Sequence, residues 1–465
     1  MKPLAARHGK RLRGALAAIA GAGLIAIAVP ATAAVTATDW PGYLDGPEHG
    51  SFNSADTAIT PANAASLVLK WHAAGGFLSS PTVADGAVFI GSTAGEFYKF
   101  DEATGNVLGQ VFLGHVTKTT CSNQGFVSTA TVAYDSSRGA DIVYVSAPDG
   151  YLYALNASDL SLVWRSVIAI PSATVNDYFD WSSPTVANGK IYVGISSQCD
   201  NPLIRGAVAG YDQATGKRFA TFYTVPPRHV GGSVWSSVAV DSSGYVYVTT
   251  GNQPSGQSPL NRNYKYTLSI VKLDPDKLKV VASFQIPKSD FAGDSDFGGS
   301  PTIFGPYVGA CNKNGIYYTL LQSTMTLVWK QQIGAKSTGS TPAQCSAAAA
   351  YDGTYLYIAG PATTIGGTSY PGSIRRVDPA TGNFLWQTGL PDGVIGSPTM
   401  NGSGVIGVGT YDTTAPSQNG VFLVNASTGQ IAQALLPGDL DFAQNVFAGG
   451  MLFAANGTGL YAYGL

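Results

Sequence analysis

The chain has 465 residues, of which only 12% are charged and 57 are glycine, a composition that favours tight turns and little surface helix. Its formal net charge is −2. The first 33 residues hold five basic and no acidic residues, so the remainder carries 21 basic and 28 acidic residues, a net charge of −7. This acidic balance excludes the basic surface that nucleic-acid binding requires.

Residues 1–33 have the pattern of a secretory signal peptide. Basic residues from Lys2 to Arg13 precede an apolar run over residues 15–29, and Ala31, Thr32 and Ala33 form a small-residue cleavage site. An uncleaved anchor helix is the alternative, although the run is short for a membrane span. We therefore expect a secreted, extracytoplasmic protein, and no other segment has the pattern of a transmembrane helix.

A short phrase, best preserved as Ser-Ser-Pro-Thr-Val, recurs after a lead-in of residues 34–66. Its copies lie about 46 to 63 residues apart, a spacing that with short apolar runs and turn residues is typical of a β-propeller. Because each blade needs its neighbours to bury both faces, residues 67–465 are predicted to form one closed domain. The eight copies begin at Ser79, Ser128, Ser182, Ser236, Gly299, Cys345, Gly396 and, most weakly, Ala443.

Each repeat predicts four strands. The phrase opens an inner strand, and two strands of alternating β-branched and aromatic residues follow. A turn such as residues 101–105 comes next, with an Asp whose side chain can bond backbone amides and a Gly that accepts positive φ. The fourth strand often carries a Trp, as at Trp164, Trp329 and Trp386.

The last repeat lacks a fourth strand, because the sequence stops at Leu465. Residues 67–71 resemble the missing strand, so the N-terminal strand is predicted to complete the final blade. The expected fold is all-β: an eight-bladed β-propeller of four-stranded antiparallel blades. Residues 251–267 and 287–300 are longer than the repeat requires, and long loops on a rigid ring are where function is usually found.

Four cysteines, Cys121, Cys199, Cys311 and Cys345, suggest two disulfides in an exported protein. We predict the pairs Cys121–Cys199 and Cys311–Cys345, with free buried thiols as the alternative.

The repeat resembles the pyrroloquinoline quinone (PQQ) propeller repeat over about residues 39–465. Residues 39–43, 59–63 and 69–71 look like the lead-in of quinoprotein alcohol dehydrogenases and their polyvinyl-alcohol dehydrogenase relatives. Non-catalytic scaffolds, including outer-membrane assembly factors, share the repeat, so the resemblance implies the fold more strongly than an activity.

Two segments of the fourth repeat are similar to family segments around the cofactor. Residues 231–235 and 249–252 resemble the stretch in which a Trp stacks under the quinone and an Asn binds the metal. The resemblance implies that Trp235 contacts the quinone and that Asn252 is a neutral oxygen ligand of the kind Ca²⁺ accepts. A core Trp and a turn Asn are the alternative.

Residues 294–301 look like the family's catalytic-aspartate segment. The resemblance implies that Asp294 is the base that takes the alcohol proton and also a metal ligand. It makes Asp296 the extra carboxylate ligand of the rare-earth-dependent members. Residues 309–318 resemble the segment that brings a Lys to the quinone, which implies that Lys313 contacts the cofactor. A solvated acidic loop and a surface lysine are the alternatives.

The resemblance fails at one part of the predicted pocket. Gln198 stands near the position of the family's metal-binding Glu, and Cys199 is single where the family has two adjacent cysteines. Asp200 lies close by, but nothing in the sequence assigns it the missing role. Residues 341–345 replace a Gly-Gly-x-x-Trp segment. These departures favour a degenerate cofactor pocket.

Two hypotheses follow. The first is a quinoprotein-like oxidoreductase for a small or polymeric alcohol or polyol, with PQQ and Ca²⁺ or a rare-earth ion as cofactors. The sequence has no Cys-x-x-Cys-His for covalent haem, so electrons would pass to a separate acceptor. The second is a non-catalytic extracellular binding or scaffold propeller that has lost PQQ binding.

Overall fold

A computed structural model describes residues 36–116, 125–172, 175, 177–255, 262–337, 344–435, 438–439 and 442–465. The predicted signal peptide lies outside the described residues, and so does Cys121. The helices in the described ranges are 3-10 turns of three residues each, η1 (Ala64–Ser66), η2 (Arg262–Tyr264), η3 (Lys288–Asp290) and η4 (Pro416–Gln418). None of them is long and apolar enough to cross a membrane.

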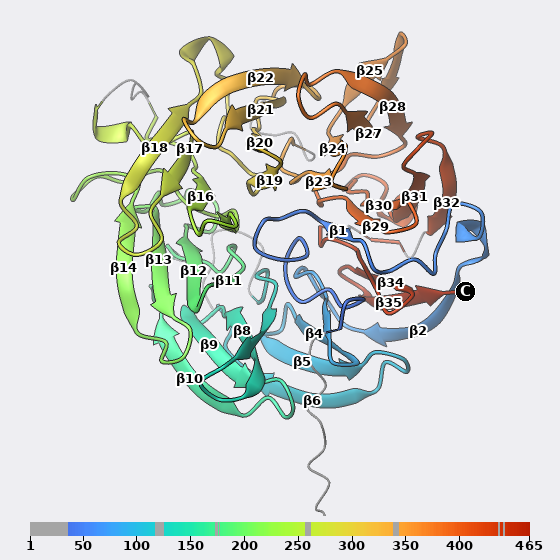
Figure 1. Cartoon of the computed structure of the whole chain (residues 1–465), viewed down its shortest axis with the longest axis horizontal. Coiled ribbons are helices and arrows are strands. Elements are labelled where there is room, and N and C mark those ends of the chain that lie inside the picture. The colour runs from blue at the N-terminus through green and yellow to red at the C-terminus, as the bar shows by residue number, and fades with distance from the viewer. Residues whose placement is uncertain are drawn as a thin grey trace, which may run out of the picture. The chain divides into compact units, whose positions relative to one another are not determined.

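Eight antiparallel sheets surround a common axis, with the first strand of each nearest the centre and the fourth at the rim (Figure 1). This confirms the predicted eight-bladed β-propeller. Blades 1 to 4 contain β3 (Thr82–Ala84), β4 (Ala87–Gly91), β5 (Glu96–Asp101), β6 (Val107–Phe112); β7 (Thr131–Asp135), β8 (Ala140–Ser146), β9 (Tyr151–Asn156), β10 (Leu162–Val167); β11 (Thr185–Ala187), β12 (Lys190–Ile195), β13 (Ala207–Asp212), β14 (Arg218–Tyr223); and β15 (Ala239–Val240), β16 (Val246–Thr249), β17 (Ser269–Leu273), β18 (Val280–Gln285).

The second half of the ring repeats this arrangement, with an added hairpin in blade 6. Blades 5 to 8 contain β19 (Thr302–Phe304), β20 (Tyr307–Cys311), β21 (Ile316–Leu321), β22 (Thr326–Gln332); β23 (Ala350–Tyr351), β24 (Leu356–Gly360), β27 (Gly372–Val377), β28 (Phe384–Leu390), with the hairpin β25 (Thr363–Ile365) and β26 (Thr368–Tyr370); β29 (Thr399–Asn401), β30 (Val405–Gly409), β31 (Val421–Asn425), β32 (Ile431–Leu435); and β33 (Val446–Ala448), β34 (Met451–Ala455), β35 (Gly459–Gly464), β2 (Val68–Ala74).

The final blade is completed from the other end of the chain. Strand β2 pairs antiparallel with β35, from Val68 opposite Gly464 to Ala74 opposite Gly459. The prediction that an N-terminal strand closes the ring is therefore confirmed. Strand β2 covers the outer edge of β35, which would otherwise be an unpaired edge of the kind that templates aggregation.

The recurring phrase explains how neighbouring blades are joined at the hub. The backbone amide at its second position donates to the side-chain hydroxyl at the same position of the next blade. The threonine two residues later donates its own hydroxyl to a backbone carbonyl of the next blade, as Thr82 does to Ala130 at 2.7 Å. The amide-to-hydroxyl bonds of 2.9–3.1 Å link Ser80 to Thr129, Thr129 to Ser183, Ser183 to Ser237, Ser237 to Ser300, Ala348 to Ser397 and Gln444 to Ser80. The predicted register of the sixth copy, from Cys345, is wrong by two residues, because the donor in blade 6 is Ala348 and not Ser346.

Tryptophans of the outer strands join the blades at the rim. The Trp164 indole N–H donates to the carbonyl of Gln213 in blade 3 at 3.2 Å, and its ring covers Gly216, which has a φ of +69°. In the same turn, the Asp212 carboxylate accepts from the amide and the hydroxyl of Thr215. Equivalent contacts join Trp71 to Gly105, Trp329 to Gly382 and Trp386 to Gly429.

The lead-in lies across one end of the hub, where Figure 1 shows the blue segment passing over the centre of the ring. Its backbone carbonyls accept from the inner strands of six blades, and β1 (Phe52–Asn53) pairs parallel with β29. Trp40 and Leu44 are fully buried there. The six amide donors are Val83, Val132, Val240, Ile303, Tyr351 and Met400.

Candidate functional site

The hub contains a cavity of about 460 Å³, and each blade contributes to its wall. Successive side chains at the start of each inner strand point in opposite directions. Residues two positions apart therefore point into the cavity together, one farther along its axis than the other. At the lead-in end the cavity is lined by hydroxyls of the recurring phrase. Two residues earlier in six of the blades lies an apolar belt, which we define as Leu78, Val127, Trp181, Trp235, Ile395 and Phe442; blades 5 and 6 have Gly298 and Ser346 there.

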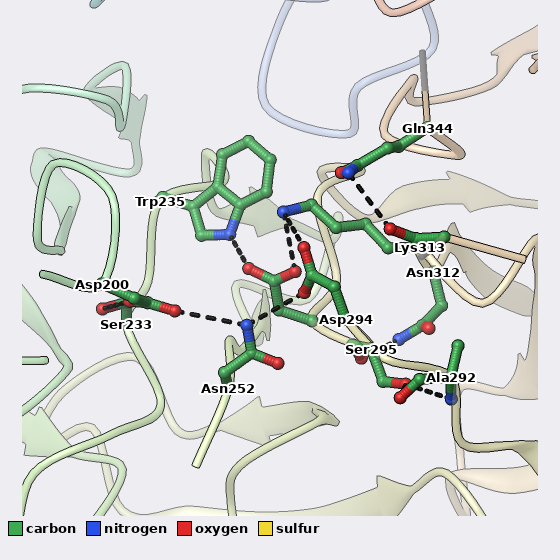
Figure 2. A network of polar contacts seen from close by, with 12 residues as sticks. Asp200, Ser233, Trp235, Asn252, Ala292, Asp294, Ser295, Asn312, Lys313 and Gln344 are labelled. Carbon is green, nitrogen blue, oxygen red and sulfur yellow. Dashed lines mark hydrogen bonds and ion pairs between the residues drawn. The ribbon is translucent and has the colours of Figure 1, made fainter. Parts of the chain in front are cut away.

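Above the belt, one polar network contains all five residues predicted from the sequence. The Lys313 ammonium lies 3.0 Å from Asp294 Oδ2 and 2.9 Å from Asp296 Oδ1. The Trp235 indole N–H donates to Asp296 Oδ2 at 2.9 Å, and the Asn252 amide donates to Asp294 Oδ1 at 3.0 Å. Figure 2 shows the side chains of Trp235, Asn252, Asp294 and Lys313 pointing toward one another.

Local backbone contacts fix each of these side chains. Asn252 follows β16, and its carbonyl accepts from the amide of Gly232 at 2.6 Å. The loop that carries Asp294 and Asp296 is held by Ser295, whose carbonyl accepts from the Asn312 side chain at 2.7 Å. Lys313 lies in the turn between β20 and β21, where its own amide donates to the Asp296 carbonyl at 3.1 Å.

The charges in this network are strongly coupled. Burial raises the pKa of Asp296 to about 7, although the Lys313 ammonium opposes the shift. Burial also disfavours ionised Asp294, but its hydrogen bond with Asp296 and the Lys313 charge outweigh that effect and lower its pKa to about 2. Burial disfavours charged Lys313, yet the two carboxylates raise the pKa of its ammonium. Asp294 is therefore the member that stays ionised at neutral pH.

Asp200 belongs to the same network, which the sequence did not establish. Its Oδ2 accepts from the Asn252 amide at 3.2 Å, while its Oδ1 accepts from the hydroxyls of Ser197 and Ser233 at 3.0 and 3.2 Å. Gln198, which stands near the family's Glu position, also lines the cavity. A carboxylate is thus present at this side of the pocket, two residues beyond Gln198.

Trp181 is a second pocket residue that sequence reasoning missed. Its ring lies 6.0 Å from that of Trp235 and 5.9 Å from that of Phe442, edge-on or tilted to both. A signal for it was available, because Trp181 precedes Ser182 and Ser183 as Trp235 precedes Ser236 and Ser237. Because Trp181 and Trp235 occupy the same position of their repeats, both indoles lie in the belt.

One predicted disulfide is present, between Cys311 and Cys345. It joins the end of β20 to the segment that carries Gln344 and Ser346, both of which line the cavity. The predicted Cys121–Cys199 pair stays a prediction, because Cys121 lies outside the described residues.

The donor set fits a hard cation. In the part of the chain that the structure describes, three or more His, Cys, Asp or Glu side chains are nowhere grouped closely enough to form a metal cluster by themselves. Here, however, an amide joins the carboxylates: the Asn252 side-chain nitrogen lies within 3.2 Å of both Asp200 and Asp294. A half-turn of that amide presents its oxygen instead, and carboxylate and amide oxygens are the ligands that Ca²⁺ prefers.

Comparison with known proteins places this site in context. The family model described as "Glucose/ethanol/alcohol dehydrogenase, beta-propeller domain" of the PQQ group matches residues 40–320. The chain belongs to the PQQ β-propeller family. This family contains PQQ-type oxidoreductases, and the polar network described above, from Asp200 to Lys313, lies within the matched residues.

Three relatives show the range of similarity. A quinohemoprotein alcohol dehydrogenase of Pseudomonas putida is 28% identical over 275 residues, covering 50% of this chain and 37% of its own. This PQQ-family chain therefore spans little more than a third of the curated relative's length. Among solved structures, a europium-containing methanol dehydrogenase has a TM-score of 0.72 at 15% identity, covering 92% of this chain and 98% of its own. BamB from Moraxella catarrhalis has a TM-score of 0.55 at 14% identity, covering 86% and 98%. These structures support the fold alone.

Proposed function

We propose that the protein is a PQQ-type oxidoreductase that acts on an alcohol or polyol. One observation carries the proposal: the segments that resemble the family's floor, metal, base and lysine positions converge on a single buried network inside a family propeller. Trp235, Asn252, the Asp294–Asp296 pair and Lys313 come from four separate segments, and a purely structural role for each would not require them to meet.

In this proposal Asn252, Asp294 and Asp296 hold Ca²⁺ or a rare-earth ion, and Asp200 adds the carboxylate absent at Gln198. Three carboxylates face one ammonium, so a divalent cation brings the group to neutrality, which favours its binding. The quinone, when bound, supplies the two-electron acceptor.

The chain's own groups prepare the substrate hydroxyl. Asp294 stays ionised at neutral pH and accepts the hydroxyl proton, as a general base must. Lys313, held 5.0 Å over the Trp235 ring, contributes a fixed positive charge beside the place where negative charge develops. Trp235 offers its aromatic face to a planar ring, and the apolar belt excludes water from that side.

The curated relative matches this chain over only part of its own length, so only part of its activity is proposed for this chain. The Pseudomonas putida relative is an alcohol dehydrogenase with haem, whereas this sequence has no Cys-x-x-Cys-His. We therefore propose a separate electron acceptor, and the export signal leads us to propose action outside the cytoplasm. An alcohol is the substrate class that the names of the relatives support.

A non-catalytic binding or scaffold propeller is the second candidate. Two observations favour it: Gln198 stands where the family has Glu, and Lys313 is the sole cationic side chain among the described residues that line the cavity. PQQ carries several carboxylates, which a single, already paired ammonium neutralises poorly. The fold shared with BamB is compatible with this candidate.

Titration of the purified protein with PQQ and Ca²⁺ or La³⁺, followed by an alcohol assay with an artificial electron acceptor, separates the two. Quinone binding and turnover support the enzyme, and Asp294→Asn then abolishes turnover with little change in thermal stability. The matched control is Asp276→Asn, which alters a carboxylate on the protein surface and leaves turnover intact. Absence of quinone binding with every cation removes the enzyme proposal.

A further inference from the structure

Four hydroxyls at the lead-in end of the cavity have donors that the protein does not use. Ser80, Thr129, Ser183 and Ser237 are at most 4% exposed, and all four line the cavity. Each oxygen accepts the backbone amide of a neighbouring blade, as described above. A hydroxyl also has one proton to donate. Among the described residues, none of these four hydroxyls donates to a protein acceptor, so their protons are available to the cavity.

Tyr43 supplies a fifth hydroxyl from the lead-in. Six blades have a hydroxyl at this position, whereas blade 8 has Gln444 and blade 6 has Ala348. The Tyr43 hydroxyl lies beside the side chains on either side of the gap at Ala348, 3.4 Å from Ser397 and also near Ser300. Burial raises the pKa of Tyr43, so its phenol remains a donor. The five hydroxyls of Ser80, Thr129, Ser183, Ser237 and Tyr43 are called the hydroxyl arc below.

The belt lies directly above the hydroxyl arc. Its members precede the arc residues by two positions, a step of about 7 Å along an extended chain. Trp181 and Trp235 stand above Ser183 and Ser237, so a molecule in contact with the arc also meets aromatic surface. Aromatic rings pack well against C–H groups, whereas they offer little to water alone.

The net negative charge of the cavity favours a neutral ligand over an anion. Its charged side chains in the described ranges are three carboxylates, Asp200, Asp294 and Asp296, against the single ammonium of Lys313. An anion would satisfy the arc's donors but would be repelled by this excess of negative charge. A neutral oxygen acceptor avoids the repulsion. With about 460 Å³ available, the cavity has room for far more than a few waters.

We propose that the hydroxyl arc and the belt form a binding site for a small neutral polyol, whose oxygens accept from the arc and whose C–H faces pack on Trp181 and Trp235. The site is defined by binding alone. It does not depend on the oxidoreductase proposed above, and it can be tested with no quinone present.

The test titrates the purified, quinone-free protein with erythritol by isothermal calorimetry. Acetate and 1-butanol serve as probes that carry a negative charge or a single hydroxyl. Erythritol should bind at least five-fold more tightly than either. Thr129→Val, which removes one arc donor, should weaken erythritol binding about five-fold, the effect of one ordinary hydrogen bond.

The matched control is Thr82→Val. It makes the same substitution between the same two blades and also removes an inter-blade bond, but Thr82 does not line the cavity. Its erythritol affinity should stay within two-fold of the unaltered protein. Tyr43→Phe removes an arc donor without breaking a bond between blades, so it tests the site even where Thr129→Val fails to fold. The proposal is overturned by absence of erythritol binding, by equal or tighter binding of acetate or 1-butanol, or by equal losses in Thr129→Val and Thr82→Val.

Discussion

Replacing Lys313 with methionine tests whether its ammonium is the counter-charge of the pocket carboxylates. The Lys313 side chain is 15% exposed and its partners Asp294 and Asp296 are 19% and 6% exposed. Lys313→Met keeps most of the side-chain volume but leaves both carboxylates without a cation. Breaking a buried ion pair from one side costs about 3–5 kcal/mol, and partial exposure of Asp294 favours the lower end, about 3 kcal/mol.

That loss corresponds to a measurable change in thermal stability. With an unfolding entropy of about 2.1 cal/mol/K per residue, a chain of this length loses about 3 °C in Tm for about 3 kcal/mol. Ca²⁺ at a hundred times its Kd adds about 2.7 kcal/mol to any variant that binds it. Because loss of the ammonium leaves the pocket more negative, Lys313→Met should unfold earlier than the unaltered protein in EDTA and gain more in Tm from the same concentration of Ca²⁺.

Differential scanning calorimetry in EDTA and in Ca²⁺ measures both effects. Lys330→Met is the matched control, since Lys330 pairs with Asp290 at 2.7 Å outside the pocket and is 41% exposed. It should cost less than Lys313→Met, because the Tyr318 hydroxyl still donates to Asp290 at 2.9 Å, and it should show no extra gain with Ca²⁺. The reasoning fails if Lys313→Met is as stable as the unaltered protein in EDTA, or if Ca²⁺ shifts the two variants equally.

Three further predictions concern stability. Burial lowers the pKa of His49 to about 4, so the folded protein takes up a proton there less readily than the unfolded chain. The free energy of unfolding is therefore unaffected by His49 above about pH 6.5 and falls by about 3 kcal/mol as the pH approaches 4. His49→Gln should flatten the fall of Tm between pH 7 and 4.5, and parallel curves would contradict this. Gly216→Ala, with positive φ and a Cβ position 2.5 Å from an indole carbon, should cost about 2–4 kcal/mol by urea unfolding. Gly189→Ala, with positive φ but open space, should cost about 1 kcal/mol, and equal costs would refute the packing argument. Replacing Cys311 and Cys345 together with serine opens a 34-residue loop and should cost about 4 kcal/mol; an unchanged urea midpoint would refute this.

The fold could be predicted because the recurring phrase is itself the joint between blades. Its second residue supplies the hydroxyl that accepts the neighbouring amide, and its Thr supplies the donor to the neighbouring carbonyl. The same holds for Trp164 and Gly216 at the rim. Because each contact between blades needs a particular side chain, the same residues recur in the sequence once per blade.

The lead-in shows the opposite case. It was expected only to precede the propeller, yet it lies across the hub and bonds six blades. Those bonds use backbone carbonyls, which any residue supplies, so no residue pattern announces them.

The candidate site was predictable in part for a related reason. Trp235, Asn252, Asp294, Asp296 and Lys313 stand in segments whose order resembles the family, and the structure brings them together. Asp200 was not predicted, because it occupies no family position. Its backbone is left-handed, with a φ of +57°, and its side chain joins the network from there. The hydroxyl arc was not predicted, because its Ser and Thr residues belong to the recurring phrase, which the sequence pattern marks only as the start of an inner strand.

The pairing of β2 with β35 makes closure of the ring depend on two segments that lie far apart in the sequence, with Val68 opposite Gly464. Contacts between such distant segments form slowly, because the long intervening chain must first be brought into a compact arrangement. We therefore expect blade 8 to complete its sheet after the blades whose four strands are consecutive in sequence. Until it does, β2 and β35 each present an unpaired edge, and unpaired edges of this kind can pair with strands of another copy.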